Sequence, residues 1–354
     1  MSKTHLKNEI TVLITGAGSP SAVTIFKAMR SSSLNPRIIA MDADPLSVGL
    51  FRADVAYCVP KVIENKSNYI EKLITICRQE KVQIVCFGTE VEMQSLAPLR
   101  AEIEKESGAR LILNEALYLD LFMDKWRTAE LLREYSIPAP DSVMVSDRHA
   151  VEDLLKRHSY PLLLKPRKGS GSKNCFVIHN QEELDFFGKY VPDAVLQEYL
   201  FPDNEEYTIG VYKSLRQGYV GQIIFKRNLA SGLTYKAELV HDPEIESVCR
   251  KLVETFDIWG PINIQLRKTP SGPKIFEVNL RFSSSCSMRA HLGFNEAEMC
   301  IRDLILGESI PAPAIESGFE LRYWDEVHVS KSDYEKLVSA GTSQGRCGFK
   351  MEDF

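Results

Sequence analysis

The sequence predicts a protein that is α/β in its first part and α+β in its C-terminal part. Residues 10–115 alternate short apolar or β-branched runs with helical stretches, and this alternation predicts a parallel sheet with right-handed crossovers. After about residue 200, strand-like runs dominate and end in an alternating hairpin. Because 354 residues are many for one hydrophobic core, we expect two or three domains.

The first unit has short apolar strands and helices whose apolar residues recur at helical spacing. In the second of these helices, Ile70, Leu73, Ile74 and Cys77 keep that spacing. The expected strands are Ile10–Thr15, Ile38–Met41, Gln83–Phe87 and Arg110–Leu113, and the expected helices include Ser21–Arg30 and Tyr69–Glu80.

Two further units and a tail follow. The second unit has helical segments at 115–122 and 127–135, which Pro138 and Pro140 stop, and a strand that ends in Leu162–Pro166. The third has strands near 207–212, 219–226, 262–266 and 275–279, and helices at 244–256 and 296–306. We therefore divide the chain into residues 1–114, 115–199 and 200–312, and leave the tail 313–354 unassigned.

Composition and charge exclude several classes of protein. A net charge of −5 argues against a general nucleic-acid binder, which needs a basic surface. No apolar run approaches the roughly 20 residues that span a bilayer, and the N-terminus lacks the apolar core of a signal peptide. None of the eight cysteines forms a C-x-x-C pair. We expect a cytoplasmic protein with reduced thiols that binds neither membrane nor nucleic acid.

The most informative stretch is the hairpin between Gly260 and Gly293. Its two runs flank a turn at 270–273, which predicts a loop longer than the tightest turns. Because alternate residues of a strand share a face, Glu277, Asn279 and Arg281 line up on one side, if the strand runs that far, while Asn263 and Gln265 share a face of the partner strand. Oxygen donors beside an arginine suit a divalent metal and polyphosphate. The alternative is an amphipathic hairpin with a solvated polar face.

A glycine-rich turn follows the first strand. Residues 16–22 read GAGSPSA, which matches the dinucleotide-binding pattern up to Ser21, and Asp42 closes the next strand where that fold places a ribose-binding acid. This pattern raises the alternative of a nicotinamide-dependent oxidoreductase. The simpler interpretation is a tight strand-to-helix turn that binds no nucleotide.

Two more segments carry chemistry for a nucleotide. Lys165 ends a strand and precedes the loop Gly169–Ser172, whose small residues let backbone N–H groups approach phosphate, although the segment does not match a Walker P-loop. A flexible basic turn is the alternative. The strand Val195–Leu200 leaves one acid, Glu198, and backbone groups that can read adenine; an ordinary strand is equally compatible with it.

In this order the segments resemble the ATP-grasp superfamily. The chain is most similar to a single module of the carbamoyl-phosphate synthase large chain and to related stand-alone carboxylate–amine ligases, over about residues 10–310. The resemblance implies an ATP-grasp fold: a Rossmann-like pre-ATP-grasp domain at 1–114, a small lid subdomain at 115–199 and a C-terminal subdomain with the metal site at 200–312. Its most specific element is Q-x(11)-E-x-N-x-R, from Gln265 to Arg281.

The resemblance also implies roles for individual residues. Phosphate contacts fall on Lys125 and Lys165, with a flap at Gly169, Ser170, Gly171 and Ser172. Adenine contacts fall on Glu198, Tyr199 and Leu200, and a ribose contact falls on Glu206, with Thr208 as the alternative in nearly the same register. Metal ligands fall on Gln265, Glu277 and Asn279, and phosphoryl stabilisation falls on Arg281 and Arg227. Many members carry an acid where Gln265 stands, whereas the carbamoyl-phosphate synthase branch has Gln.

The implied reaction uses ATP and Mg²⁺, with Mn²⁺ as a substitute, to join a small-molecule carboxylate to an amine. Glu90, Ser283 and His291 are the expected substrate contacts; a helix N-terminal acid and a structural histidine are the alternatives for Glu90 and His291. A homo-oligomer is compatible with these expectations. The rival function is a catalytically silent nucleotide-binding or partner-binding protein with the same fold.

Overall fold

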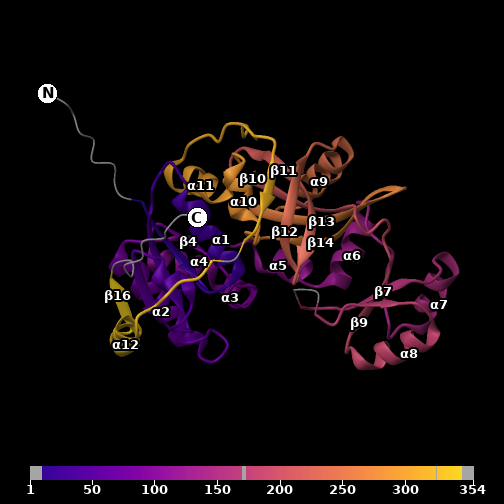
Figure 1. The fold of residues 1–354 in the computed structure, drawn as a ribbon, viewed down its shortest axis with the longest axis horizontal. Helices are drawn as coiled ribbons and strands as arrows, with labels where there is room; N and C mark the ends of the chain where they lie inside the picture. The colour runs from indigo at the N-terminus through magenta and orange to yellow at the C-terminus, as the bar shows by residue number, and fades with distance from the viewer. Residues whose placement is uncertain (1–9, 170–172, 324, 345–354) are drawn as a thin grey trace. The chain divides into compact units, whose positions relative to one another are not determined.

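The computed structural model describes residues 10–169, 173–323 and 325–344 (Figure 1). Contacts divide the chain into two compact units. Of the described residues, the first unit comprises 10–116, 281–314 and 325–344, and the second comprises 117–169, 173–280 and 315–323. Each unit is described by itself. Among the described residues, no helix combines the length and apolar character needed to cross a membrane.

The first unit is built on a six-stranded sheet with the strand order β16-β3-β2-β1-β4-β5. Its strands are parallel except β16, and every residue of β1 is buried. The order reverses between β1 and β4, which is where α/β sheets bind ligands at the carboxyl ends of their strands. The strands are β1 (Thr11–Thr15), β2 (Arg37–Asp42), β3 (Val55–Cys58), β4 (Ile84–Cys86), β5 (Arg110–Leu111) and β16 (Thr342–Gln344).

The helices of this unit begin and end at residues that favour such positions. Ser19 caps α1 with its side chain and Pro20 takes the first helical position, while α2 ends at Lys81 in the left-handed conformation. The α-helices are α1 (Pro20–Arg30), α2 (Lys66–Glu80), α3 (Glu90–Leu96), α4 (Arg100–Ser107), α10 (Cys286–His291), α11 (Glu296–Ile301) and α12 (Lys331–Ala340). Short 3-10 turns span Val48–Phe51 and Ala97–Leu99, and a π-helical turn spans Arg302–Leu306.

The second unit begins with two helices and a small antiparallel sheet. The strand order is β6-β9-β7-β8, and Leu162, Leu164, Ile178 and Leu196 are fully buried in its core. Its elements are α5 (Ala116–Phe122), α6 (Lys125–Glu134), β6 (Ser142–Met144), α7 (Arg148–Arg157), β7 (Leu162–Pro166), β8 (Phe176–Ile178), α8 (Gln181–Tyr190) and β9 (Ala194–Glu198).

A larger antiparallel sheet completes the second unit, with the order β14-β13-β10-β11-β12-β15. Helix α9 (Pro243–Thr255) contacts β10, β11 and β14 and buries Ile245, Cys249, Leu252 and Val253. The strands are β10 (Glu206–Ser214), β11 (Gly218–Ala230), β12 (Leu233–Val240), β13 (Gly260–Thr269), β14 (Gly272–Asn279) and β15 (Phe319–Leu321).

The structure corrects four details of the sequence analysis. The hairpin turn is shorter than expected, because Thr269 pairs with Gly272 and leaves only two residues between the strands; Gly272 has φ 105°, which a side chain would disfavour. The predicted helix 296–306 is α11 followed by a π turn. Residues 281–314 pack with the first unit rather than with 200–280. The unassigned tail contributes β15 to one sheet, and α12 and β16 to the other unit.

Candidate nucleotide and metal site

The predicted metal edge lies on β13 and β14. Gln265 stands directly opposite Glu277, and Asn263 opposite Asn279, because a β-bulge after Gln265 sets the register. Glu277 Oε1 accepts hydrogen bonds from Gln265 Nε2 at 3.0 Å and from Asn279 Nδ2 at 2.8 Å. The structure therefore brings together the three residues predicted as metal ligands.

Arg227 on β11 sets the orientation of Gln265. Its Nη2 donates to Gln265 Oε1 at 2.6 Å and to Glu206 Oε1 at 2.8 Å. Because a guanidinium only donates, Gln265 must turn its amide oxygen toward Arg227 and its amide nitrogen toward Glu277. Sequence reasoning placed Arg227 at a phosphoryl group; in the structure its guanidinium lies between the predicted ribose contact and a predicted metal ligand.

The side chains of this edge are of the chemical type that binds a hard divalent cation. A carboxylate and two amides supply oxygen ligands of the type that Mg²⁺ accepts, provided both amides rotate their oxygens outward. Among the residues that the structure describes, no group of three or more His, Cys, Asp or Glu side chains could hold a metal ion. A metal site here would thus have Glu277 as its carboxylate, and phosphate oxygens of a nucleotide would strengthen it.

Glu206 on β10 is held by two arginines. Besides Arg227, it pairs with Arg267, whose Nη2 lies 2.8 Å from Glu206 Oε2 and whose backbone stands directly opposite on β13. Arg267 Nη1 donates to the carbonyl of Leu200 at 2.7 Å and to Asp203 at 3.0 Å. Arg267 is a residue that sequence reasoning missed, because only strand register brings it to Glu206.

Lys165 ends β7 and is almost completely buried, with 5% of its surface exposed. Its Nζ donates to Gln197 Oε1 at 2.9 Å, and Gln197 is fixed in turn by Ser142. Burial, reinforced by the nearby charge of Lys125, lowers the pKa of Lys165 to about 8, although Glu277 and Cys175 act in the opposite direction. Lys125, Lys165 and Glu277, all predicted site residues, thus interact electrostatically.

Lys125 and its neighbour organise the start of the loop after β7. Lys125 Nζ donates to the carbonyl of Gly169 at 2.6 Å, and Arg167 pairs with the buried Asp124, which also caps α6. Gly169 has φ 121°, which favours glycine. The rest of the predicted flap, Ser170, Gly171 and Ser172, lies outside the described residues.

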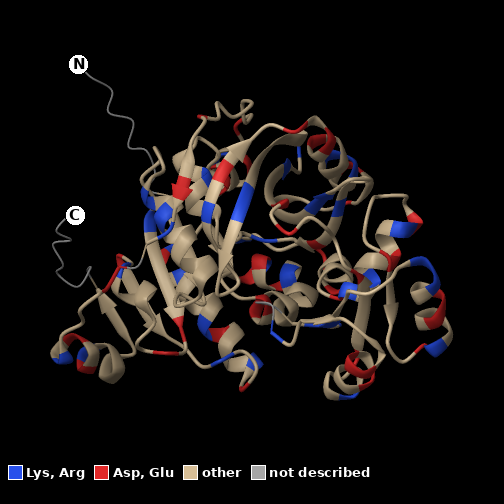
Figure 2. Cartoon of the chain, turned by 45° about the vertical axis from the view of Figure 1, so that its right-hand side comes forward, with Lys and Arg blue, Asp and Glu red and all other residues tan. Residues whose placement is uncertain are grey.

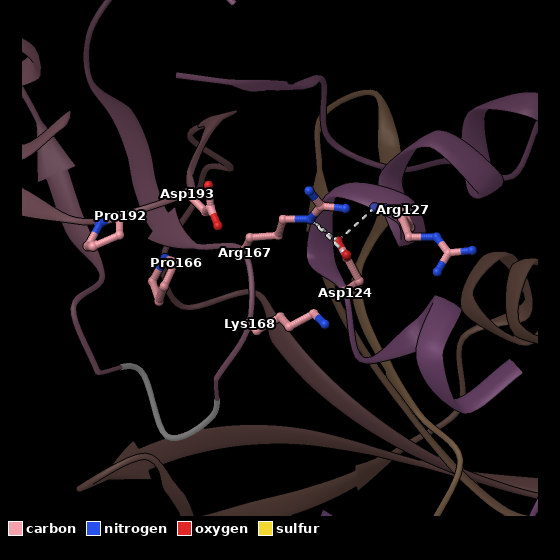
Figure 3. Close-up of a pocket in the computed structure, with 7 residues that line it drawn as sticks. All are labelled: Asp124, Arg127, Pro166, Arg167, Lys168, Pro192 and Asp193. Carbon is pink, nitrogen blue, oxygen red and sulfur yellow. Dashed lines mark hydrogen bonds and ion pairs between the residues drawn. The ribbon is translucent and has the colours of Figure 1, made fainter. Parts of the chain in front are cut away.

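A charged cavity of about 460 Å³ adjoins this loop (Figure 3). In Figure 3 the Arg167 side chain reaches toward Asp124, while the Arg127 side chain points away from it. Basic and acidic side chains therefore both line the cavity, and Arg167 already neutralises the carboxylate of Asp124. Its lining residues are Asp124, Arg127, Pro166, Arg167, Lys168, Pro192 and Asp193.

The predicted adenine hinge follows β9. The carboxylate of Glu198 pairs with Lys274 Nζ at 2.7 Å and 2.8 Å and accepts the backbone N–H of Asp141. Tyr199 donates its hydroxyl to Asp203, and the Leu200 carbonyl accepts from Arg267. Glu198 is thus paired with Lys274, a lysine to which the sequence analysis gave no role. Basic and acidic residues also lie close together on other strands and helices (Figure 2).

The predicted substrate residues all belong to the first unit. Glu90 Oε1 accepts from Arg281 Nε at 2.9 Å and Nη2 at 2.7 Å, just beyond the carboxyl end of β4. Ser283 is buried, its carbonyl accepting from Thr24, and His291 is exposed at the end of α10. The structure joins Glu90 to Arg281, and it gives Ser283 contacts within the protein core.

The glycine-rich turn is filled by the protein itself. The Gly18 N–H donates to Asp42 Oδ2 at 2.9 Å, so the group that would face a pyrophosphate in the dinucleotide interpretation meets the predicted ribose acid instead. A Cβ on Gly16 would lie 2.6 Å from Thr89, and one on Gly18 would lie 2.4 Å from Ser47. Close packing explains these glycines without a bound nucleotide.

Beneath this turn lies Glu92, which sequence reasoning also missed. Hydroxyl groups of Thr15, Tyr69 and Thr89 donate to its carboxylate at 2.7–2.8 Å. Burial raises the pKa of Glu92, and the three hydrogen bonds oppose that change. The cluster joins the loops that follow β1 and β4.

Comparisons with family models cover most of the chain in two parts. Residues 12–112 match the PylC-like N-terminal domain. Residues 190–327 match the family described as ATP-grasp in the biosynthetic pathway with Ter operon. The two matches follow the order predicted from the sequence.

Relatives and solved structures agree with these matches. The chain is 23% identical over 266 residues to the carbamoyl phosphate synthase large chain of Archaeoglobus fulgidus, spanning 70% of this chain but only 23% of that protein. It is 22% identical to the C-terminal section of the same enzyme from Methanopyrus kandleri, over 81% of this chain and 53% of that one. The chain thus spans about a quarter of the length of the full large chain.

Among solved structures, an ADP complex of N5-carboxyaminoimidazole ribonucleotide synthetase superposes with a TM-score of 0.69 at 14% identity, covering 87% of this chain and 79% of that one. The biotin carboxylase domain of 2-oxoglutarate carboxylase from Hydrogenobacter thermophilus, solved with MgADP, gives 0.66 at 18% identity and covers 87% and 73%. At such identities these likenesses show the fold, and they confirm the predicted ATP-grasp fold.

Proposed function

We propose that this chain, which belongs to the ATP-grasp superfamily, is an ATP-dependent ligase that activates a carboxylate as an acylphosphate and joins it to an amine. The observation that carries the proposal is the setting of Lys165. Its ammonium group is buried beside Lys125 and opposite the charge of Glu277, and burial of a cation is costly without anionic partners. The phosphates of a nucleoside triphosphate would supply anionic partners in addition to Glu277.

The reaction would take place in two steps. A carboxylate oxygen attacks the γ-phosphorus, the bond to the β–γ bridging oxygen breaks, and ADP leaves. The amine nitrogen then attacks the acyl carbon, and phosphate leaves with the former carboxylate oxygen while the amine loses a proton. Atoms balance as acid, amine and ATP giving amide, ADP and phosphate.

The residues of the second unit would bind the nucleotide and offset its charge. Lys125 and Lys165 would contact phosphate, with Gly169, Ser170, Gly171 and Ser172 as the flap. Mg²⁺, or Mn²⁺ in its place, would bind to Gln265, Glu277 and Asn279 and would neutralise the charge of the nucleotide phosphates. Arg227 would stabilise the transferring phosphoryl group. The base and ribose contacts would be Glu198, Tyr199, Leu200 and Glu206.

In the first unit, Arg281 and Glu90 would serve the substrate side. Arg281 would stabilise the phosphoryl group, and Glu90 would contact the amine. Ser283 and His291 complete the proposed substrate contacts.

One observation favours a second candidate, a silent nucleotide-binding protein. The metal edge has one carboxylate, Glu277, and both of its neighbours are neutral amides. A low negative charge weakens binding of hard cations, and phosphoryl transfer depends on their charge.

The test is ADP release from ATP and Mg²⁺ with individual carboxylates and amines, beside a nicotinamide absorbance assay. We expect release that requires both an acid and an amine. Glu277→Gln keeps the shape but removes the charge, so kcat should fall by on the order of 10² or more while ATP affinity falls modestly. Glu254→Gln, on the exposed face of α9, is the matched control and should leave turnover unchanged. If the protein bound ATP but released no ADP with any pair of carboxylate and amine, the result would favour the silent nucleotide-binding protein.

A further inference from the structure

A continuous line of polar contacts crosses the large sheet of the second unit. It begins at the hinge carbonyl of Leu200 and passes through Arg267 to Glu206. From Glu206 it continues through Arg227 to Gln265 and ends on Glu277. Every link is between 2.6 Å and 3.0 Å, and the line joins the proposed base-binding segment to the proposed metal edge.

The charged groups of this line are largely removed from water. The side chains of Arg227, Glu206 and Arg267 are 8%, 15% and 16% exposed. Ion pairs in such surroundings hold their geometry more firmly than surface pairs, and loss of one partner leaves an uncompensated charge. Movement of the Glu206 carboxylate should therefore shift the guanidinium groups of both arginines.

Arg267 is placed at some energetic cost. Its Nε is buried and lacks a hydrogen-bond partner among the described residues. An unsatisfied buried donor is unfavourable, so optimal hydrogen bonding of the arginine itself does not explain its position. Its position does let one guanidinium contact the Leu200 carbonyl, Asp203 and Glu206 together.

Glu206 retains limited capacity for a ligand. An ionised carboxylate has about four acceptor positions, and three N–H groups already point at Glu206. A ribose hydroxyl would take the remaining position and fix the carboxylate further. That would hold Arg227, and with it the amide of Gln265.

We propose that Arg267 is a positioning residue that transmits occupancy of the base-binding hinge to the metal edge through Glu206 and Arg227. The inference rests on the proposed nucleotide site. Adenosine at the hinge orders the Leu200 carbonyl and Glu206, and it thereby holds Arg227 on the amide oxygen of Gln265, whose amide nitrogen stays toward Glu277. A metal at this edge needs that oxygen turned outward, so the binding of a phosphate-free nucleoside and of a metal is negatively coupled, and the coupling is reciprocal.

The coupling can be measured without turnover, with adenosine and Mn²⁺ as probes. Free Mn²⁺ is determined by electron paramagnetic resonance with and without saturating adenosine, which carries no phosphate to bind the metal. In the wild type, adenosine should weaken Mn²⁺ binding by about fivefold or more, and Mn²⁺ should weaken adenosine binding by the same factor.

In Arg267→Met the factor should fall to about one, although each ligand still binds alone. Arg267→Lys, which keeps the charge but cannot span three acceptors, should lower it and serves if the first variant does not fold. Arg250→Met, in an exposed pair on α9, is the control and should keep the wild-type factor.

A wild-type factor of one with both ligands bound, or an unchanged factor in both Arg267 variants, would overturn the inference and leave the proposed function standing. Adenosine that tightens Mn²⁺ binding, or Mn²⁺ that does not bind with or without adenosine, would also overturn the inference. Failure of the wild type to bind adenosine would contradict the proposed function itself, and the inference with it.

Discussion

Lys165 illustrates how a single buried charge links binding to pH. Its depressed pKa of about 8 means that the folded protein releases this proton more readily than the unfolded chain, whose lysines titrate near 10.5. Between these values the unfolded state binds more protons, so this residue makes stability rise with pH, by on the order of 3 kcal/mol in all. Phosphate binding favours the protonated form of Lys165, so this residue favours ATP binding at lower pH.

We therefore expect apparent ATP affinity to weaken above about pH 8, approaching tenfold per pH unit if only the protonated lysine binds. Lys165→Arg keeps its charge at all accessible pH values and should remove this dependence. Lys165→Ala should lose most of the binding at every pH. Calorimetric titration between pH 7 and 9.5 measures this; an unchanged slope in Lys165→Arg would show that another group titrates.

Sequence motifs locate the residues that a ligand would touch but not the residues that hold them. Lys165 and Glu277 stand out because their neighbours in sequence form recognisable patterns. Gln197, Arg267 and Lys274 carry no such pattern. Gln197 and Arg267 meet their partners through pairing with strands far along the chain, and Lys274 contacts Glu198 from a strand of the other sheet of the same unit. Strand register is not readable from one sequence when several pairings bury the same apolar faces.

At the scale of elements, strands and helices with clear periodicity were predictable, and the short strands of the tail were not. The predicted strand at 162–166 coincides with β7, and the predicted 244–256 helix is α9 shifted by one residue. Strands β15 and β16 have three residues each and pair with the edge strands β12 and β3. Pairing with an existing edge, rather than intrinsic propensity, makes them strands.

Helix α12 gives a direct test of the tail's packing. Leu337 is fully buried whereas Val338 is 50% exposed, and α12 contacts β3 and β16 within the first unit. Leu337→Ala should lower the free energy of unfolding by about 2–4 kcal/mol, because it removes buried methyl groups and leaves a cavity. Val338→Ala on the same helix should change it by less than about 0.5 kcal/mol.

Thermal and urea unfolding of the two variants provide the comparison. Equal, small effects would mean that α12 does not stabilise the first unit.

At the scale of the whole molecule, the fold was predictable because its pieces occur in a characteristic order, from the turn at Gly16 to the hairpin that ends near Arg281. The division into units was less accessible. Residues after Arg281 return to the first unit through contacts such as Thr24 with Ser283 and Ser32 with Glu298, which join positions more than 250 residues apart. Local patterns contain no signal for such pairings.

The central claim, activation of a carboxylate by transfer of the γ-phosphoryl group, is tested most directly with an acid labelled by ¹⁸O in its carboxylate. Mass spectrometry of the products of an acid and an amine that support turnover follows the label. The account predicts one ¹⁸O in each inorganic phosphate, unlabelled ADP, and the remaining ¹⁸O in the amide. Label in AMP, with pyrophosphate as the second product, would show adenylation and contradict the proposed reaction.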